Sequence, residues 1–143
     1  MSNFNRFMKQ NKAKKENTQY PATTSLTDEN GNPLLWDIKP LSTKDDEAIK
    51  DSCMLEVPVV GKPNLYRQKM NTTAYMAKML VASVVSPDLN DAELQDSYGV
   101  KKPDDLLKEL IDNPGEYNEF AMFVQKFNGF TTTLEEKVEE AKN

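Results

Sequence analysis

Histidine is absent from this 143-residue sequence, and cysteine occurs once, at Cys53. The lack of histidine excludes every Ser-His or Cys-His nucleophile and every metal site with a histidine ligand. Cys53 has no second thiol with which to form an internal disulfide or a zinc site, so a reducing cytosol suits the chain. Because no base accompanies it in the sequence, we interpret Cys53 as a small buried hydrophobic side chain and not as a redox or nucleophilic thiol.

Glycine is also scarce, and its five occurrences are isolated from one another. A phosphate-binding loop needs clustered glycines, so no such loop is expected. The acidic residues that follow Asp88 invite a calcium site, but an EF-hand loop begun there would place Glu93 where glycine is needed and Gly99 where glutamate is needed. We interpret these acids as helix caps and solvated helix faces. The sequence therefore predicts a non-enzymatic protein with no catalytic site, no metal site and no cofactor.

Long hydrophobic runs are missing as well. No stretch of about 18 apolar residues exists that could span a bilayer, and the N-terminus opens with polar and basic residues where a signal peptide would have an apolar run. The hydrophobic fraction of 38% is nevertheless enough for one core at this length. These features predict a soluble, single-domain protein with no membrane partner.

Charge is distributed unevenly along the chain. Residues 1–15 contain five basic side chains and no acidic one, which leaves a net charge of −10 for the remainder of a chain whose total is −5. We interpret residues 1–19 as a basic mobile arm, because its few bulky apolar residues cannot bury enough surface to offset the entropy of ordering it. Residues 20–130 are then expected to form a single domain, and residues 131–143 an acidic C-terminal tail that frays.

Three roles for the basic arm are compatible with its composition. Its five cations, with Phe4 and Phe7 between them, could contact a nucleic acid. Nucleic-acid binding is disfavoured, because the acidic body repels phosphate backbones. The arm could dock on the acidic body of a second copy and promote a homo-oligomer. The third role is that of a disordered arm that keeps the protein soluble, and we favour this one.

Alternating residues in the N-terminal third predict a β-hairpin. It joins residues 21–27 to residues 34–39 through an Asn-Gly turn. In its second strand Leu34, Trp36 and Ile38 share one face. Trp36 is therefore expected in the core.

A second short hairpin is predicted further along the chain. It joins residues 55–60 to residues 65–69 through a Gly-Lys-Pro-Asn turn. Because Pro58 lacks a backbone donor, its strand is expected at a sheet edge.

Helical spacing and capping residues predict the other elements. The expected helices cover residues 43–53, residues 72–85, a short segment after Asn90, a segment from Pro103 to the Asn113-Pro114-Gly115 break, and residues 117–127. Asn90, with Glu93 three residues later, is expected to cap the third helix, and Gly99 to close it. The second helix is apolar nearly all round, which predicts a central position or partial cover by another chain. The fold class is therefore α+β, with N-terminal β-hairpins followed by a mainly helical half of several short helices.

Without catalytic chemistry, the surface is expected to bind proteins. Methionine side chains form adaptable contact surfaces, and we select Met76, Met79 and Met122 as candidate partner-binding residues. Plain core packing is the alternative for each of them. Met122 is the exception, because it falls opposite the apolar stripe of its helix on a 3.6-residue wheel. An exposed Met122 would be a partner contact.

Four stretches of the sequence resemble a known family. They are Leu35–Leu41, Ala82–Val100, Pro114–Tyr117 and Phe127–Phe130, of which the second is the longest and most specific. In these stretches the chain resembles the XkdN-like phage tail assembly chaperones, which belong to phages and prophages of Gram-positive bacteria. The resemblance covers about residues 34–130 and leaves out the basic arm and the C-terminal tail.

The resemblance implies a protein that binds the tape measure protein, a long and largely helical phage protein, and keeps it soluble until the tail tube polymerises around it. The expected place of action is the cytoplasm of the bacterial host, and the chaperone is not expected in the mature virion. A frameshifted longer form of the chain and a second copy of it are further candidate partners. The alternative function is a minor structural protein that stays in the phage tail. The family has no catalytic residues to carry over.

Overall fold

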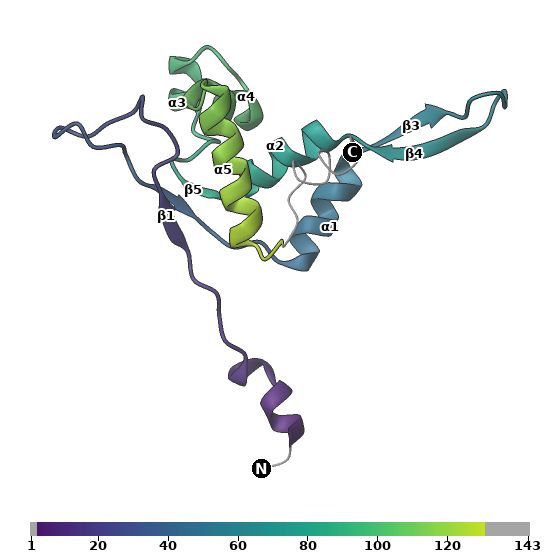
Figure 1. Cartoon of the computed structure of the whole chain (residues 1–143), viewed down its shortest axis with the longest axis horizontal. Helices are drawn as coiled ribbons and strands as arrows, with labels where there is room; N and C mark the ends of the chain where they lie inside the picture. Colours follow the sequence, from purple (N-terminus) through teal and green to yellow (C-terminus); the bar gives the residue numbers. More distant parts are fainter. Residues whose placement is uncertain (1–2, 131–143) are drawn as a thin grey trace.

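The structure is a computed structural model that describes residues 3–130, so the predicted C-terminal tail lies outside the described residues. The helices are η1 (Asn3–Phe7), η2 (Lys9–Asn11), α1 (Thr43–Ser52), α2 (Thr72–Ser83), α3 (Ala92–Ser97), α4 (Pro103–Leu110) and α5 (Pro114–Phe127). The strands are β1 (Thr18–Tyr20), β2 (Trp36–Ile38), β3 (Met54–Pro58), β4 (Tyr66–Met70) and β5 (Val84–Ser86). This order confirms the α+β class. Figure 1 shows a central body from which the N-terminal arm and the β3–β4 hairpin project in different directions.

A small antiparallel sheet has the strand order β1-β2-β5, and it differs from the first predicted hairpin. The partner of β2 is Thr18–Tyr20, with Tyr20 opposite Trp36, and residues 21–27 form no strand. Pro21 has no backbone donor, which disfavours ladder pairing at that point. The Asn-Gly turn survives inside the loop, where Gly31 has a positive φ of 83°. Strand β1 therefore begins within the range that the sequence assigned to the mobile arm.

The second helix ends earlier than its apolar run predicts. Residues 72–85 were expected to be helical, but α2 ends at Ser83, and Val84 pairs with Ile38 as the first residue of β5. The free edge of β2 provides these hydrogen bonds, and β-branched valines suit a strand. Tertiary pairing therefore overrides the helical pattern for the last two residues.

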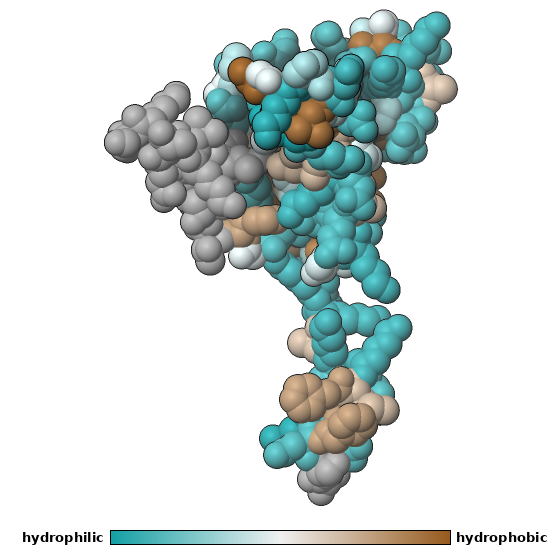
Figure 2. Space-filling view, turned by 90° about the vertical axis from the view of Figure 1, so that its right-hand side faces the viewer, coloured by the Kyte–Doolittle hydropathy of each residue, from teal (hydrophilic) through white to brown (hydrophobic). Residues whose placement is uncertain are grey.

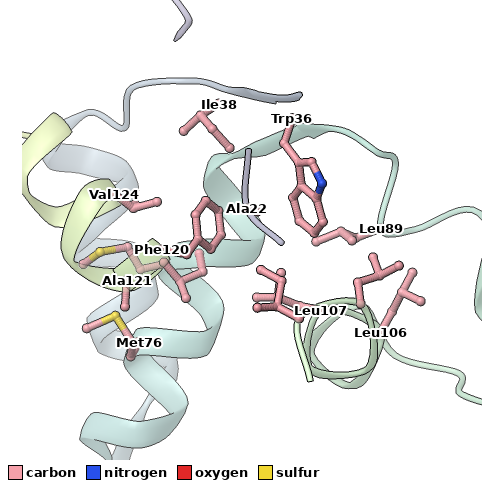
Figure 3. Close-up of a cluster of buried hydrophobic side chains, with 14 of the residues drawn as sticks. Ala22, Trp36, Ile38, Met76, Leu89, Leu106, Leu107, Phe120, Ala121 and Val124 are labelled. Atoms are coloured by element: carbon pink, nitrogen blue, oxygen red, sulfur yellow. The ribbon is translucent and has the colours of Figure 1, made fainter. Parts of the chain in front are cut away.

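The core lies between the sheet and helices α2, α4 and α5 (Figure 3). Trp36 is 2% exposed, as predicted, and its ring meets the edge of Phe120 at a centroid distance of 5.8 Å. Phe120 also stacks on Tyr20 of β1. The apolar side chains of α4 and its C-terminal end are buried, at 3% exposure or less: Leu106, Leu107, Leu110 and Ile111. The aromatic residues of three elements thus join the sheet to the helical half.

The loop after β1 is held to the first turn of α5 by one carboxylate. Glu116 accepts hydrogen bonds from the Thr23 hydroxyl at 2.8 Å and from the backbone N–H of Thr24 at 2.9 Å. These hydrogen bonds lower the pKa of Glu116 below its usual value. At the other end of α5, the Asn128 side chain accepts from the backbone N–H of Leu41 at 2.7 Å. Both ends of α5 are therefore tied to the N-terminal third of the chain.

The cap of α3 is Asp91 and not Asn90. The Asp91 carboxylate accepts from the backbone N–H of Leu94 at 2.8 Å, whereas the backbone N–H of Asn90 donates to Asp88 in the preceding turn. The predicted cap was one residue early, because Asn and Asp are equally good caps and stand side by side. Gly99 closes the helix with a φ of 70°, as predicted.

This cap can be tested by comparing two alanine substitutions. Asp91→Ala should lower the free energy of unfolding by about 1 kcal/mol, because it removes the acceptor for an N-terminal helix donor. Asn90→Ala should cost less than half as much. Urea unfolding followed by circular dichroism measures both, and a larger loss for Asn90→Ala would contradict the assignment.

Candidate functional site

The β3–β4 hairpin projects from the body, and most of its residues are exposed. It was predicted from the sequence, and it extends away from the helices in Figure 1. Of the ten residues in its two strands, only Val57 and Met70 are as much as half-buried. A two-stranded hairpin that stands free in water is marginally stable by itself. Its exposure therefore favours a partner that covers it.

Cross-strand pairing sorts the hairpin residues onto two faces. Leu55 pairs with Lys69 and Val57 with Arg67, and directly opposed side chains lie on the same face. The backbone N–H of Val59 donates to Leu65 at 2.9 Å, which extends the ladder by one pair. We call this surface the aliphatic face. It consists of Leu55, Val57, Val59, Leu65, Arg67 and Lys69.

The aliphatic face combines apolar surface with positive charge. Leu55 is 50% exposed and Leu65 is 47% exposed, so each presents a large side chain to solvent. Arg67 and Lys69 stand on the same face, and residues 54–70 as a whole contain three cations and one anion. The opposite face pairs Glu56 with Gln68 at its centre, between Met54 and Tyr66, and it has no exposed aliphatic strip of this kind. The aliphatic face is thus suited to an apolar partner with acidic flanks.

The root of the hairpin is joined firmly to α1 and α2. The backbone N–H of Asn71 donates to the carbonyl of Cys53 at 2.8 Å, and the Asn71 side chain caps α2. Between the two helices, the Tyr75 hydroxyl donates to Asp46, whose other oxygen lies 3.1 Å from Lys50 Nζ. Burial and the neighbouring Asp46 raise the pKa of Tyr75 well above its usual value. The base of the hairpin is therefore attached to two helices that are linked to each other by a hydrogen bond.

The predicted contact methionines fall in different places. Met79 is 1% exposed and Met76 is 8% exposed, and Figure 3 draws Met76 among the buried side chains. This placement agrees with core packing, and neither side chain offers a surface to a partner in this conformation. Met122 lies outside the hydrophobic cluster but is half-buried, which is less exposed than its place on the helical wheel predicted. A partner contact by Met122 remains a prediction.

The hairpin residues are not among those that the sequence suggested as a binding site. The available signal was the alternation of Leu55, Val57 and Val59 next to Arg67 and Lys69. That alternation is equally typical of a strand packed on a core. Only the position of the hairpin outside the body separates the two interpretations.

Within residues 3–130, no three side chains of the metal-ligating types are grouped so that they could hold an ion. Cys53 is buried at the end of α1, with its sulfur 3.7 Å from the Ser52 hydroxyl. None of the helices in this part of the chain combines the length and apolar composition needed to cross a bilayer.

Known proteins are similar to this chain in sequence or in fold. Protein XkdN of the phage-like element PBSX from Bacillus subtilis is 26% identical over 129 residues, which cover 90% of this chain and 85% of the relative. YqbN, also from Bacillus subtilis, is 23% identical over 128 residues with the same coverage. The crystal structure of YqbN matches with a TM-score of 0.73 at 18% identity, over 91% of this chain and 98% of that chain. The last match shows a shared fold.

The family match extends beyond the stretches that suggested it. The model of the family described as phage XkdN-like tail assembly chaperone protein matches residues 4–142, which include the basic arm. The longest resembling stretch, Ala82–Val100, corresponds in the structure to the end of α2, β5 and α3. It contributes the core residue Leu89 and the cap Asp91, so it specifies the fold. By this match, the chain belongs to the family of XkdN-like phage tail assembly chaperones.

Proposed function

We propose that this chain binds the tape measure protein through the aliphatic face of the β3–β4 hairpin and keeps it soluble before the tail tube polymerises. Membership of a tail assembly chaperone family supports the general role. The observation that carries the site is the hairpin itself, which exposes Leu55 and Leu65 outside the core. A chaperone must cover apolar surface on its client, and exposed apolar residues on a soluble protein mark such contacts.

The geometry of the aliphatic face suits an amphipathic helix. Its aliphatic side chains form a short strip along the hairpin, and a helix presents a matching stripe at intervals of three and four residues. Arg67 and Lys69 stand beside the strip, where acidic residues flanking the stripe of a client helix would meet them. Charged rims of this kind accelerate association and select partners more than they add affinity.

The proposed place of action is the cytoplasm of the bacterial host, with no copy retained in the finished particle. A minor structural protein of the tail would share the family match and the exposed hairpin. Quantitative mass spectrometry of purified particles separates the two functions. Recovery of this chain in a fixed ratio to tail proteins would contradict the chaperone role.

Co-expression with the tape measure protein tests the proposed site. Wild-type chain should keep most of the tape measure protein in the soluble fraction and co-elute with it. Leu55→Ser combined with Leu65→Ser should reduce the soluble fraction at least severalfold. The double substitution removes apolar contact area, and burial of such area contributes a free energy of about 25 cal/mol per Å². The matched control is Glu56→Ser with Gln68→Ser on the opposite face, which should behave like the wild type.

The outcomes separate the function from the site. A tape measure protein that stays insoluble with wild-type chain would refute the proposed function. If it stays soluble with the serine variant of the aliphatic face, the function stands and the hairpin is not the contact surface. Circular dichroism of each variant establishes that the body is still folded.

A further inference from the structure

The N-terminal arm carries two exposed phenylalanines, Phe4 and Phe7. Phe7 is 85% exposed and Phe4 is 70% exposed, both on the short helix η1. The Asn11 side chain donates to the carbonyl of Asn5 at 2.6 Å, which holds η1 and η2 together. Figure 2 shows hydrophobic residues gathered near the free end of an otherwise hydrophilic arm. Two neighbouring exposed phenylalanines on a soluble protein indicate a contact with another molecule.

The root of the arm is anchored to the body by a strand and by a cation–π contact. Strand β1 pairs with β2, and Lys15 Nζ lies 4.2 Å from the centre of the Phe127 ring. From this point the arm leaves the body, and in Figure 1 its end lies on the opposite side of the molecule from α3 and α4. The end of the arm, which includes Phe4 and Phe7, therefore lies away from α3 and α4 of its own chain.

The charge of the arm is complementary to that helical half. The arm has five cations and no anion within its first 15 residues. Residues 88–119 contain ten acidic residues and three lysines, a net charge of −7. Because the two regions lie at opposite ends of one copy, the attraction between them is best satisfied by a second copy.

The acidic end also has a shallow, open cavity beside which an aromatic ring could lie. It has a volume of about 260 Å³ and lies at the junction of α4 and α5. Its lining is Lys108, Ile111, Asp112, Pro114, Tyr117 and Asn118. Burial raises the pKa of Tyr117, and the nearby Asp104 carboxylate raises it further, so negative potential reaches the cavity. An aromatic ring beside Tyr117 would stack on it, and Arg6 would lie near acidic residues.

We propose that the N-terminal arm of one copy docks on a second copy of this chain, with Phe4 or Phe7 at the α4–α5 cavity and the arm cations against the acidic residues around it. Because an arm contacts a different surface on the second copy, two copies that exchange arms reciprocally would form a closed two-fold dimer, whereas one-way docking would join copies head to tail. One-way docking closes into a ring or extends into a filament. It depends on opposite charges at an exposed surface, so salt weakens it.

Two full-length variants break the two sides of this contact separately. The arm variant is Phe4→Ser with Phe7→Ser, which changes exposed residues only. The cavity variant is Asp104→Lys with Asp112→Lys, which reverses charge beside the cavity. Val60→Ser, at the 98% exposed tip of the hairpin, is the control for a contact made by the hairpin. Sedimentation velocity at about 50 mM and about 500 mM salt measures the mass of each.

The expected result is a pattern across the variants. Wild type and Val60→Ser should sediment as assemblies larger than a monomer at low salt and as monomers at high salt. The arm variant alone and the cavity variant alone should each be monomeric at low salt. An equimolar mixture of the two should form dimers and nothing larger, because one intact arm and one intact cavity remain.

Three results would overturn the proposal. They are a wild type that is monomeric at low salt, a mixture that stays monomeric, and a loss of assembly in Val60→Ser alone. Nucleic-acid binding by the arm is tested in the same samples with a labelled single-stranded oligonucleotide. Assembly of the wild type that appears only when the oligonucleotide is added would also overturn it.

Discussion

Phe120→Ala is expected to lower the free energy of unfolding by about 3–5 kcal/mol, the range for deleting a buried aromatic ring. Phe120 is 0% exposed and lies between Tyr20 of β1 and Trp36 of β2, at centroid distances of 5.7 and 5.8 Å. Its removal leaves a cavity where α5 meets the sheet. Both ring contacts are lost together with the buried area. A loss of this size is a large part of the total stability of a small domain.

Chemical unfolding at high salt measures this effect on the monomer. Phe7→Ala is the matched control, because the same side chain is removed from a position that is 85% exposed. It should change the free energy of unfolding by less than about 0.5 kcal/mol. A loss below about 1 kcal/mol for Phe120→Ala would show that the Phe120 ring does not join the helical half to the sheet.

Tyr75→Phe is expected to lower the free energy of unfolding by about 2 kcal/mol, the size of a hydrogen bond to a charged group. The substitution keeps the buried ring of α2 and removes the hydroxyl that donates to Asp46 of α1. Asp46 then retains Lys50, at 3.1 Å, as its charged partner. The loosened α1–α2 pair is also the base of the β3–β4 hairpin.

Tyr75 also predicts a dependence of stability on alkaline pH. Its pKa is raised in the folded state, so folding favours the protonated hydroxyl. The stabilisation is complete below the unfolded pKa of about 10 and is lost as the pH rises above it toward the folded value. Tyr20 and Tyr117 have raised pKa values as well, so they also contribute to the wild-type decline above pH 10. Tyr75→Phe should make this decline shallower.

Urea unfolding at pH 8 and at pH 10.5 measures both effects of Tyr75→Phe. The control is Tyr66→Phe, because the Tyr66 side chain is 59% exposed on the hairpin. This control should match the wild type at pH 8. Equal stability of Tyr75→Phe and wild type at both pH values would contradict a structural role for the Tyr75–Asp46 hydrogen bond.

Several elements could be predicted because their signals are local. Ser42 and Asp45 form the capping box that begins α1, and Pro103 stands in the first turn of α4. Caps and proline positions depend on backbone groups within one helical turn. The apolar stripe of α4 and the burial of Trp36 followed from periodicity alone.

The errors arose where two distant segments compete. Residues 21–27 were predicted as the partner strand, but β2 pairs with Thr18–Tyr20. Val84 and Val85 continue a helical pattern, yet in the structure they belong to strand β5. In both cases the deciding hydrogen bonds come from β2, which is far away in sequence from at least one of its neighbours. No local pattern contains that information.

The amino-acid sequence by itself determined the α+β class, the separation of a basic arm from an acidic body, and the family. These properties depend on composition, periodicity and residue identity, which need no knowledge of distant contacts. Only the tertiary structure decided which apolar residues are free to bind. Met76 and Met79 lie in the core, whereas Leu55, Leu65, Phe4 and Phe7 stand outside it. The physical reason is that burial depends on how the elements pack together, and a hydrophobic side chain has the same sequence signature on either side of the surface.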